Sequence, residues 1–407
     1  MVPEIITVPL LQLASGDRLS LQVYRYVGRY PGKKIYIQAN LHGAELAGNA
    51  VIHEVLAGLK TLDDADLRGE IWLVPLCNPL GVNQRSHHFA TGRYNPYDGR
   101  DWNRIFWDYE KQVDRSCIQQ FAQTHLQTSL ATLQAAYRHT IHQKFLADQQ
   151  QEAQGGGAPL HHRYRNCLQS LALDADTVID LHSSSNYGLT YLYYGGDRHL
   201  GAALFGLDLA IQLDRYDGDA FDEAFIKPWL ALERDLEALG RSLRFDLEAY
   251  TLELGSAMQL QPDSVERGVQ GIQAYLYGKQ VITQRWTTPL PLATPQLYRA
   301  STIQRYYAPT GGMVRSQVAL GDRIAAGQVL CEILHVPKGG DAYPQVMKMP
   351  AMQAGLVFDV GINQAVNEGE YVLSLLPEPG TATGSPLHDA VIDRETAQGN
   401  RNNQSDD

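Results

Sequence analysis

Short apolar runs alternate with amphipathic segments along the first two thirds of the chain, and this alternation constrains the fold more than any other feature. Runs of strand length occur at 33–40 (KKIYIQAN) and 70–79 (EIWLVPLCNP). The segment between them, 44–60, has its apolar residues at helical spacing. A strand, a helix and a second strand in this order are typical of a parallel sheet covered by helices.

The same alternation returns further along the chain. Strand-like runs follow at 176–184 (DTVIDLHSS), 191–196 (YLYYGG) and 249–256 (AYTLELGS). Helical segments are predicted at 228–245 and 265–278. The sequence therefore predicts an α/β fold with a mixed, mostly parallel sheet and flanking helices.

Two further segments depart from this alternation of strand-like and helical segments. Residues from about 108 to 170 are rich in Gln, Ala and Leu, which predicts a helical insertion, interrupted by the glycines at 155–157. After residue 290, short strands alternate with glycine turns, and the similar units GDRIAAGQVL and NQAVNEGEYVL suggest a small barrel or sandwich built from a repeated half. We predict an α/β domain over 1–290, an all-β domain over 300–377 and a disordered tail over 378–407.

The charge balance excludes some classes of partner. The 407 residues include 34 Lys and Arg against 45 Asp and Glu, a net charge of −11. A general nucleic-acid binder or a protein of anionic membrane surfaces would carry a basic excess instead. No apolar run reaches membrane-spanning length and the N-terminus lacks the features of a signal peptide, so we expect a cytoplasmic protein.

Two histidines directly follow strand-like runs, where α/β sheets place their ligand sites. His42 comes after the run at 33–40 with Glu45 three residues on, and His182 ends the run at 176–184. Two imidazoles and one carboxylate are a typical ligand set for catalytic zinc, with a fourth position open for water. Asp180 could orient His182 by accepting its ring N–H. The alternative is that both histidines are hydrogen-bonded core residues.

Two other features carry groups that suit hydrolysis. The run at 93–104 (RYNPYDGRDWNR) contains three arginines, whose planar guanidinium groups suit a carboxylate or a polarised carbonyl, although pairing with Asp98 and Asp101 would explain them too. Glu253 lies inside an apolar strand, where an unpaired carboxylate is costly to bury. Beside a metal, Glu253 could serve as a general base; without one it would be a structural, ion-paired residue.

Five motifs in order, HGAE, NP, R…DWNR, DLH and TLELG, resemble the succinylglutamate desuccinylase and aspartoacylase family, which is related to the zinc carboxypeptidases. The resemblance covers roughly residues 35 to 275, and the C-terminal β-unit is similar to that of the family. It implies a zinc-carboxypeptidase-like α/β fold. It also implies one Zn²⁺ per chain, held by His42, Glu45 and His182.

The resemblance also implies roles for other residues. Glu253 matches the general base, and Arg93 matches the arginine that polarises the scissile carbonyl, although Arg85 is a competitor for that role. Asn103 and Arg104 match the pair that binds the substrate carboxylate. The helical insertion is a departure from the compact members of the family, and it puts the identity of the substrate in doubt.

We therefore expect a zinc-dependent amidohydrolase that removes an acyl group from an N-acyl amino acid or a similar small amide bearing a carboxylate. Nucleic acid and membrane are not expected as partners. One alternative is a metallocarboxypeptidase that acts on peptides. A second alternative is a non-catalytic binding scaffold.

Several residues resemble functional groups but are left out of the site. Met347-Lys348-Met349 resembles the biotin attachment motif, but the long loop before it is expected to move Lys348 from a hairpin tip into a strand. His87 and His88 are expected at the surface, where they could line a cleft. Tyr306 and Tyr307 have no feature in the sequence that selects either.

Overall fold

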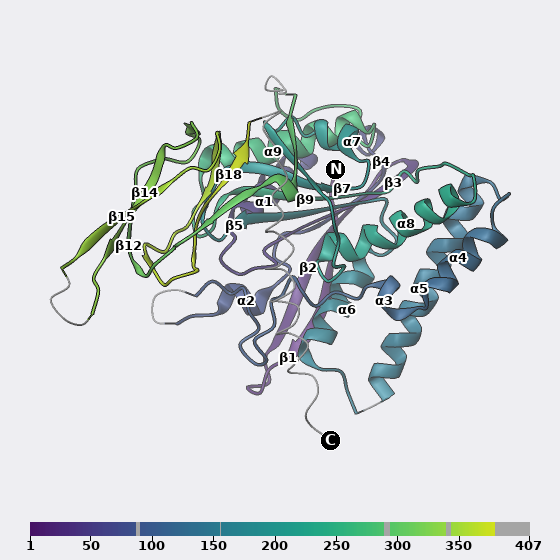
Figure 1. Cartoon of the computed structure of the whole chain (residues 1–407). Helices are drawn as coiled ribbons and strands as arrows, with labels where there is room; N and C mark the ends of the chain where they lie inside the picture. The colour runs from purple at the N-terminus through teal and green to yellow at the C-terminus, as the bar shows by residue number, and fades with distance from the viewer. Residues whose placement is uncertain (87–89, 155, 289–293, 339–342, 379–407) are drawn as a thin grey trace. The chain divides into compact units, whose positions relative to one another are not determined.

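The computed structural model describes residues 1–86, 90–154, 156–288, 294–338 and 343–378 (Figure 1). It divides into two compact units. The first contains Met1–Ser301 together with Asp359–Ile362, and the second contains Thr302–Phe358 and the described residues from Asn363 onward. Apart from Glu378, the tail predicted at 378–407 lies outside the described residues. None of the helices within the described ranges combines the length and the hydropathy needed to cross a membrane.

A nine-stranded sheet forms the centre of the first unit, with the order β1-β2-β4-β3-β5-β9-β7-β8-β10. Its strands are β1 (Glu4–Gln12), β2 (Arg18–Val27), β3 (Tyr30–Ala39), β4 (Arg68–Val74), β5 (Thr177–Ser184), β7 (Thr190–Gly195), β8 (Leu209–Leu213), β9 (Glu248–Ser256) and β10 (Gln296–Arg299). The central strands β4, β3, β5 and β9 are parallel, and β7 joins them antiparallel to β9. The predicted mixed, mostly parallel α/β sheet is confirmed.

Helices cover both faces of this sheet, and alternate residues of each strand supply two apolar cores. On one face, Ile37 and Ile179 pack with α1 (Ala47–Lys60) and α9 (Pro262–Gly278). On the other, Tyr36 and Val178 pack with α8 (Phe221–Ala238) and the helices of the insertion. Residues Gln38, Asp180 and Thr251 are adjacent in register and share the α8 face. This alternation decides which strand residues can line a site on that face.

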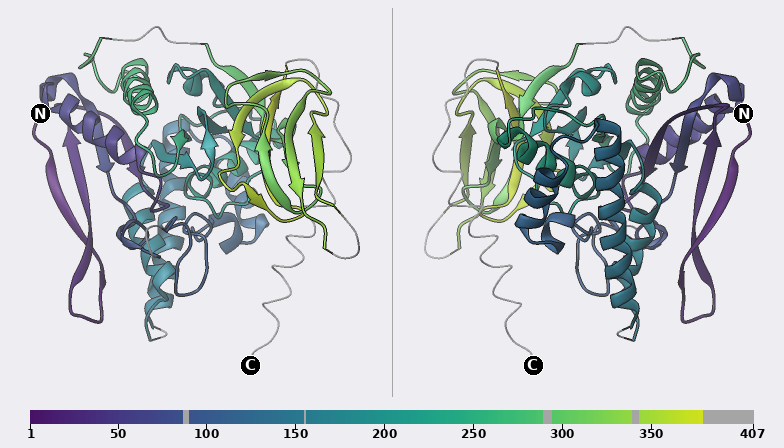
Figure 2. Two further views of the ribbon diagram at one scale, coloured as in Figure 1. Left: turned by 90° about the vertical axis from the view of Figure 1, so that its left-hand side faces the viewer. Right: turned by 90° about the vertical axis from the view of Figure 1, so that its right-hand side faces the viewer.

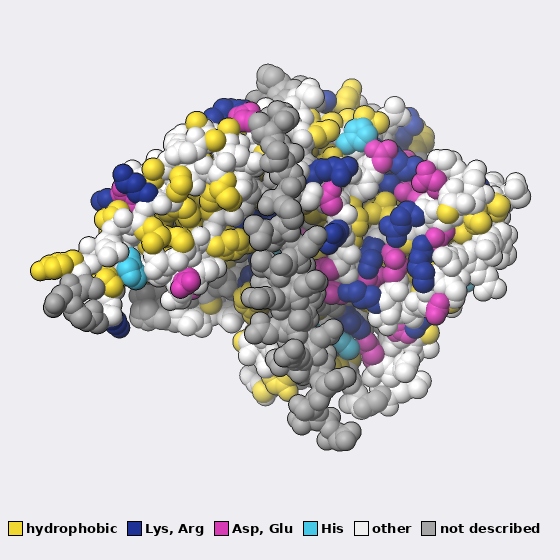
Figure 3. Space-filling model, in the orientation of Figure 1, with side chains coloured by type: hydrophobic (Ala, Val, Ile, Leu, Met, Phe, Trp, Pro, Cys, Tyr) yellow, Lys and Arg dark blue, Asp and Glu magenta, His cyan; other side chains and the backbone are white. Residues whose placement is uncertain are grey.

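The predicted insertion consists of helices packed on the α8 side of the sheet. These are α3 (Tyr109–Gln112), α4 (Arg115–Thr124), α5 (Leu130–Gln154) and α6 (Leu160–Ala172). On the face drawn in Figure 3, basic side chains over these helices and α8 are intermixed with acidic ones. Ion pairs that join α3 to α8 and to the segment before it include Lys111–Asp219 and Arg234–Glu110.

Two boundaries differ from the sequence predictions. Helix α1 begins at Ala47, not at residue 44, because the preceding residues form a turn described below. Helix α8 begins at Phe221, seven residues before the predicted start at Pro228, and ends at Ala238, before Gly240 with its positive φ of 85°. The β1–β2 hairpin was not predicted at all; Figure 2 shows it as a long purple ribbon at the edge of the first unit.

The remaining short elements of the first unit are α2 (Pro79–Asn83), α7 (His199–Ala203), the 3₁₀ turns η1 (Asp64–Asp66) and η2 (Ala300–Thr302), of which Thr302 begins the second unit, and β6 (Tyr187–Gly188). Residues Asp359 and Val360 pair with β6, which accounts for their place in the first unit. Asp359 also accepts hydrogen bonds from Ser184 and Asn186, the latter at 3.0 Å.

The second unit is built from two small antiparallel sheets. One contains β11 (Gln304–Tyr307), β18 (Tyr371–Pro377), β16 (Gly355–Val360) and β13 (Arg323–Ile324); the other contains β15 (Gln345–Pro350), β14 (Val329–His335), β12 (Gly312–Ser316) and β17 (Ala365–Val366). The two glycine-turn units have matching structures, each a two-residue strand, a turn and a seven-residue strand. Gly327 and Gly369 occupy equivalent turns with positive φ, which explains the repeated glycine.

Candidate metal centre and active site

A tight turn at the end of β3 places His42 and Glu45. Asn40 adopts a positive φ of 69°, and its side-chain amide donates hydrogen bonds to the carbonyls of His42 (3.2 Å) and Gly43 (3.0 Å). A Cβ at Gly43 would lie 2.2 Å from the backbone of Gly81, so only glycine fits there. The turn brings the His42 and Glu45 side chains together, with 2.8 Å between Nδ1 and Oε1.

His182 enters the same site from the carboxyl end of β5. Its Nε2 lies 2.9 Å from Asp180 Oδ2, and Asp180 Oδ1 accepts a hydrogen bond from Gln38 Nε2 at 3.1 Å. Gln38 in turn accepts a hydrogen bond of 3.0 Å from the Tyr36 hydroxyl. All four side chains are buried. Because this chain of contacts engages Nε2, the Nδ1 atom of His182 faces Glu45.

The three side chains form a buried cluster. Glu45 Oε1 contacts His42 Nδ1 at 2.8 Å, and Glu45 Oε2 contacts His182 Nδ1 at 2.7 Å. One potential ligand atom from each residue lies within 4.8 Å of the other two. The donors are two imidazoles and one carboxylate, each imidazole with its second nitrogen held by another carboxylate. This set fits a divalent metal ion of the catalytic type.

The electrostatics of the cluster follow from its burial and its charges. Burial opposes the charge of Glu45, but the neighbouring His42 and His182 outweigh burial and hold the pKa of Glu45 well below its usual value. Burial alone would lower the pKa of His182. The neighbouring carboxylates of Asp180 and Glu45 have the larger, opposite effect, so the pKa of His182 is raised. Glu45 is therefore ionised at neutral pH, as a metal ligand must be, and metal binding at the Nδ1 atoms would release protons.

Asp101 is a site residue that the sequence indicated only as a partner for arginine. Its Oδ1 lies 2.9 Å from His42 Nε2, and its Oδ2 lies 2.9 Å from Arg93 Nε. Burial raises its pKa, but the hydrogen bond and charge of His42 and the charge of Arg93 lower that pKa to about 2. Asp101 therefore contacts the Nε2 atom of His42 in the same way that Asp180 contacts the Nε2 atom of His182. In the sequence, Asp101 is visible only as an acidic residue in an arginine-rich loop. That pattern does not reveal its contact with His42.

The structure distinguishes the two candidate arginines. Arg93 Nη1 lies 3.8 Å from Glu45 Oε1 and donates a hydrogen bond of 3.4 Å to Ser185 Oγ. Arg85 is exposed, and its Nη1 donates to the backbone carbonyls of Val82 and Gln84, both at 2.7 Å. Arg93 borders the cluster, so it fits the role of the carbonyl-polarising group better than Arg85.

Glu253 lies on β9 directly beside His182, in register on the neighbouring strand. Its Oε2 atom is buried and has no hydrogen-bond partner among the described residues. Burial, with help from the charges of Glu45 and Asp359 and against that of His182, raises the pKa of Glu253 to about 7. A carboxyl group with a free oxygen and such a pKa can accept and return a proton near neutral pH.

Asn103 and Arg104 lie at the other end of the arginine-rich loop. Asn103 is buried, and its Oδ1 accepts a hydrogen bond of 2.9 Å from the backbone of Phe221 at the start of α8. Arg104 is half-exposed, with its Nε 3.8 Å from Asp217. The guanidinium of Arg104 is therefore accessible to an anionic ligand, whereas the amide oxygen of Asn103 is engaged in holding α8.

The remaining candidates lie outside the described residues or in the second unit. His87 and His88 lie outside the described residues. In the second unit, the Tyr306 hydroxyl accepts a hydrogen bond of 2.9 Å from the backbone of Met352, and Tyr307 is exposed. Lys348 lies within β15, opposite Glu332. This agrees with the expectation that Lys348 belongs to a strand and not to a hairpin tip.

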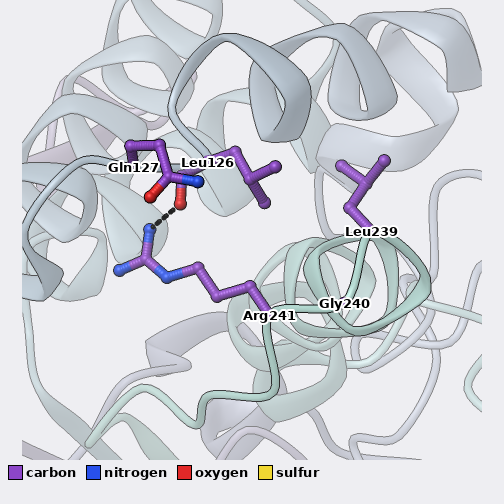
Figure 4. A pocket seen from close by; sticks show the side chains of 5 residues that line it. All are labelled: Leu126, Gln127, Leu239, Gly240 and Arg241. Atoms are coloured by element: carbon purple, nitrogen blue, oxygen red, sulfur yellow. Dashed lines mark hydrogen bonds between the residues drawn. The ribbon is translucent and has the colours of Figure 1, made fainter.

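One surface cavity of about 380 Å³ is lined by other residues. Figure 4 shows Leu126 and Gln127, after α4, facing Leu239, Gly240 and Arg241, after α8. Arg241 Nη1 donates a hydrogen bond of 2.8 Å to the carbonyl of Leu126 across this cavity. None of the predicted site residues lines it.

A mostly parallel α/β sheet with a buried His–Glu–His cluster at its carboxyl edge defines an α/β protein with a candidate catalytic metal centre. Residues 31–278, more than half of the chain, match the catalytic domain of the succinylglutamate desuccinylase/aspartoacylase family. The chain belongs to this family of hydrolytic deacylases, which confirms the resemblance seen in the sequence.

Solved structures agree with this assignment. The chain is similar to a succinylglutamate desuccinylase/aspartoacylase family protein from Shewanella amazonensis, with 31% identity and a TM-score of 0.80 over 92% of this chain and 98% of that one. A related protein from Shewanella frigidimarina has 28% identity and a TM-score of 0.81 over 92% and 97% of the two chains. The ectoine utilization protein EutE (DoeB) from Ruegeria pomeroyi, at 15% identity and a TM-score of 0.62 over 92% and 95%, shares the fold. A search of curated proteins finds no match.

Proposed function

We propose that this chain is a zinc-dependent hydrolase that cleaves the amide bond of an N-acyl amino acid or a similar small amide bearing a carboxylate. The observation that carries the proposal is the buried cluster of His42, Glu45 and His182 beside Glu253, one oxygen of which has no hydrogen-bond partner in the described part of the chain. Membership of a deacylase family supports the choice of an amide as substrate. Two imidazoles and one carboxylate favour zinc among the common metal ions.

The Nδ1 atoms of the two histidines and the Glu45 carboxylate would hold the ion. When bound, zinc supplies an activated water molecule and a Lewis acid for the scissile carbonyl. Asp101 and Asp180 accept the Nε2 hydrogens of the two histidines, which fixes the ring orientation and keeps Nδ1 free for the ion.

Other side chains would carry the proton and the developing charge. Glu253 Oε2 accepts the proton of the attacking water and then passes it to the nitrogen of the leaving amine. The Arg93 guanidinium, beside Glu45, donates hydrogen bonds to the carbonyl oxygen as negative charge develops there. The accessible guanidinium of Arg104, next to Asn103, binds the substrate carboxylate.

Metal analysis tests the proposal directly. Protein purified without chelator is expected to contain about one zinc ion per chain, as structural and catalytic zinc sites do. The His42→Ala/His182→Ala variant is expected to contain none. Absence of metal from the wild type, even after zinc is added back, would contradict the hydrolase function and favour the binding scaffold.

A substrate comparison separates the deacylase from the carboxypeptidase. The purified enzyme is assayed with a panel of N-acyl amino acids and with a decapeptide that has a free C-terminus. We expect release of the amino acid from at least one N-acyl compound. Efficient shortening of the decapeptide together with inactivity on the panel would favour the carboxypeptidase.

A further inference from the structure

Helix α6 of the insertion runs beside the arginine-rich loop at 93–104 and contacts it through two buried side chains. His161 Nδ1 lies 2.9 Å from Asp98 Oδ2. Three residues further along the same helix face, the Tyr164 ring meets the Trp102 ring edge-on, with 4.9 Å between their centroids. A polar contact and an aromatic contact therefore join the helix to the loop.

The helix also holds the segment that follows the loop. Gln169 Oε1 accepts a hydrogen bond of 2.8 Å from the backbone N–H of Trp107, and Gln169 Nε2 donates one of 2.9 Å to its carbonyl. The side chains of His161, Tyr164 and Gln169 are all buried. Helix α6 is therefore attached to the loop and to the segment after it along most of its length.

The position of Trp102 depends on this packing. Its side chain is fully buried, and its indole N–H has no hydrogen-bond partner among the described residues. Tyr164, equally buried, has its hydroxyl 3.9 Å from Cys77 Sγ. The ring contact with Tyr164 thus holds Trp102 in place without a hydrogen bond from the indole.

The loop connects this contact to the metal cluster. Trp102 directly follows Asp101, and its backbone N–H donates a hydrogen bond of 3.1 Å to the carbonyl of Arg93. Tyr94 and Asp101 form an antiparallel bridge that closes the loop. Asp101 contacts both His42 Nε2 and Arg93 Nε at 2.9 Å. A shift of Trp102 would therefore move the carboxylate that orients His42.

We propose that α6 supports the metal centre, and that Tyr164 and His161 are positioning residues that hold Asp101 against His42. The inference rests on the proposed metal-binding function of the cluster. Groups that orient a metal-bound histidine affect metal affinity strongly although they do not touch the ion. The insertion thus influences metal affinity through the loop, in addition to any effect that it has on substrate binding.

Zinc affinity, measured by competition with a chelator, tests this role independently of turnover. Tyr164→Leu removes the aromatic contact and is expected to weaken zinc binding about tenfold, the lower range for loss of an orienting partner. Tyr164→Phe keeps the ring and should bind zinc as the wild type does. Tyr137→Leu is the matched control, because Tyr137 is an equally buried tyrosine of the insertion whose hydroxyl contacts Pro228 instead of the loop.

A double variant tests whether the effect passes through Asp101. In an Asp101→Ala background, Tyr164→Leu should weaken zinc binding by less than about twofold, because the coupled group is gone. Should Tyr164→Leu not fold, His161→Ala removes the second contact between α6 and the loop, the one with Asp98, and is expected to weaken zinc binding in the same direction. Equal loss of zinc affinity in Tyr164→Leu and Tyr137→Leu, or equal loss in both backgrounds, would overturn the inference. Absence of zinc from the wild type would instead refute the proposed function itself.

Discussion

At the scale of single residues, burial gives Glu253 the properties expected of the proposed general base. Its partner on the neighbouring strand is His182 of the His–Glu–His cluster, and its Oε2 atom is buried without a hydrogen-bond partner among the described residues. A residue that only stabilised the fold would be expected to use that oxygen in a hydrogen bond or ion pair. The raised pKa, about 7, agrees with a role in acid–base chemistry.

The Glu253→Gln variant is expected to lose turnover by about 10²–10⁴-fold, the usual contribution of a general base. Zinc content should be unchanged, because Glu253 is not one of the proposed ligands. Turnover with the best N-acyl substrate and metal content are measured on the same preparation. Preserved turnover in a zinc-loaded variant would transfer the role of base to another group.

The two candidate arginines permit a paired test. Arg93→Ala removes the guanidinium that lies 3.8 Å from Glu45 and is expected to lower kcat by about 10²-fold, as for loss of one oxyanion donor. Arg85→Ala removes an exposed side chain bonded to backbone carbonyls and should leave kcat within about threefold of the wild type. A reversed order of the two effects would show that Arg85 polarises the carbonyl.

At the scale of elements, the first turn of α8 contains a carboxyl group, that of Glu223, whose ionisation is unfavourable in the folded state. Burial and the neighbouring carboxylates of Asp222 and Asp217 raise the pKa of Glu223 to about 8. The folded state therefore keeps a proton on Glu223 that the unfolded state loses near pH 4.5. This raised pKa makes the contribution of Glu223 to stability fall as pH rises from about 4.5 to 8.

We expect Glu223→Gln to reduce the loss of stability between pH 6 and pH 9 by about 2 kcal/mol relative to the wild type. Glu237→Gln, at the exposed C-terminal end of the same helix, should behave as the wild type does. Thermal or urea unfolding of the three proteins at both pH values measures the difference. Parallel pH dependence in the wild type and Glu223→Gln would refute the assignment.

The sequence predicts some of the helices and strands closely and misses others. The buried strands β3, β5 and β9 have apolar runs and end near the predicted positions, because burial on both faces favours apolar residues at most of their positions. The β1–β2 hairpin was missed because it lies at an edge of the sheet, with many of its residues exposed. Helix α1 was predicted three residues too long, because the turn at Asn40 depends on side-chain bonds to backbone carbonyls.

At the scale of the whole molecule, the proposed ion is expected to stabilise the fold. The ligands come from the end of β3 and from β5, far apart in sequence, so the site exists only in the folded state. A ligand at a thousand times its dissociation constant that binds only the folded state contributes about 4 kcal/mol.

Removal of zinc with a chelator should therefore lower the Tm of the wild type by several degrees, and added zinc should restore it. The His42→Ala/His182→Ala variant should have a Tm independent of zinc. Calorimetry of both proteins with chelator and with zinc measures the effect. A zinc-independent Tm in the wild type would show that the ion does not bind the folded cluster.

The α/β class, the family and the strand ends at which His42 and His182 stand could all be predicted from the amino-acid sequence, since apolar periodicity and motif order are local properties of the chain. Only the tertiary structure decided that Arg93 approaches Glu45 and that Asp101 orients His42. It also decided that α6 is packed against their loop. These contacts join segments that are distant in the sequence, and hydrogen bonds between such segments leave no periodic signal from which they could be predicted.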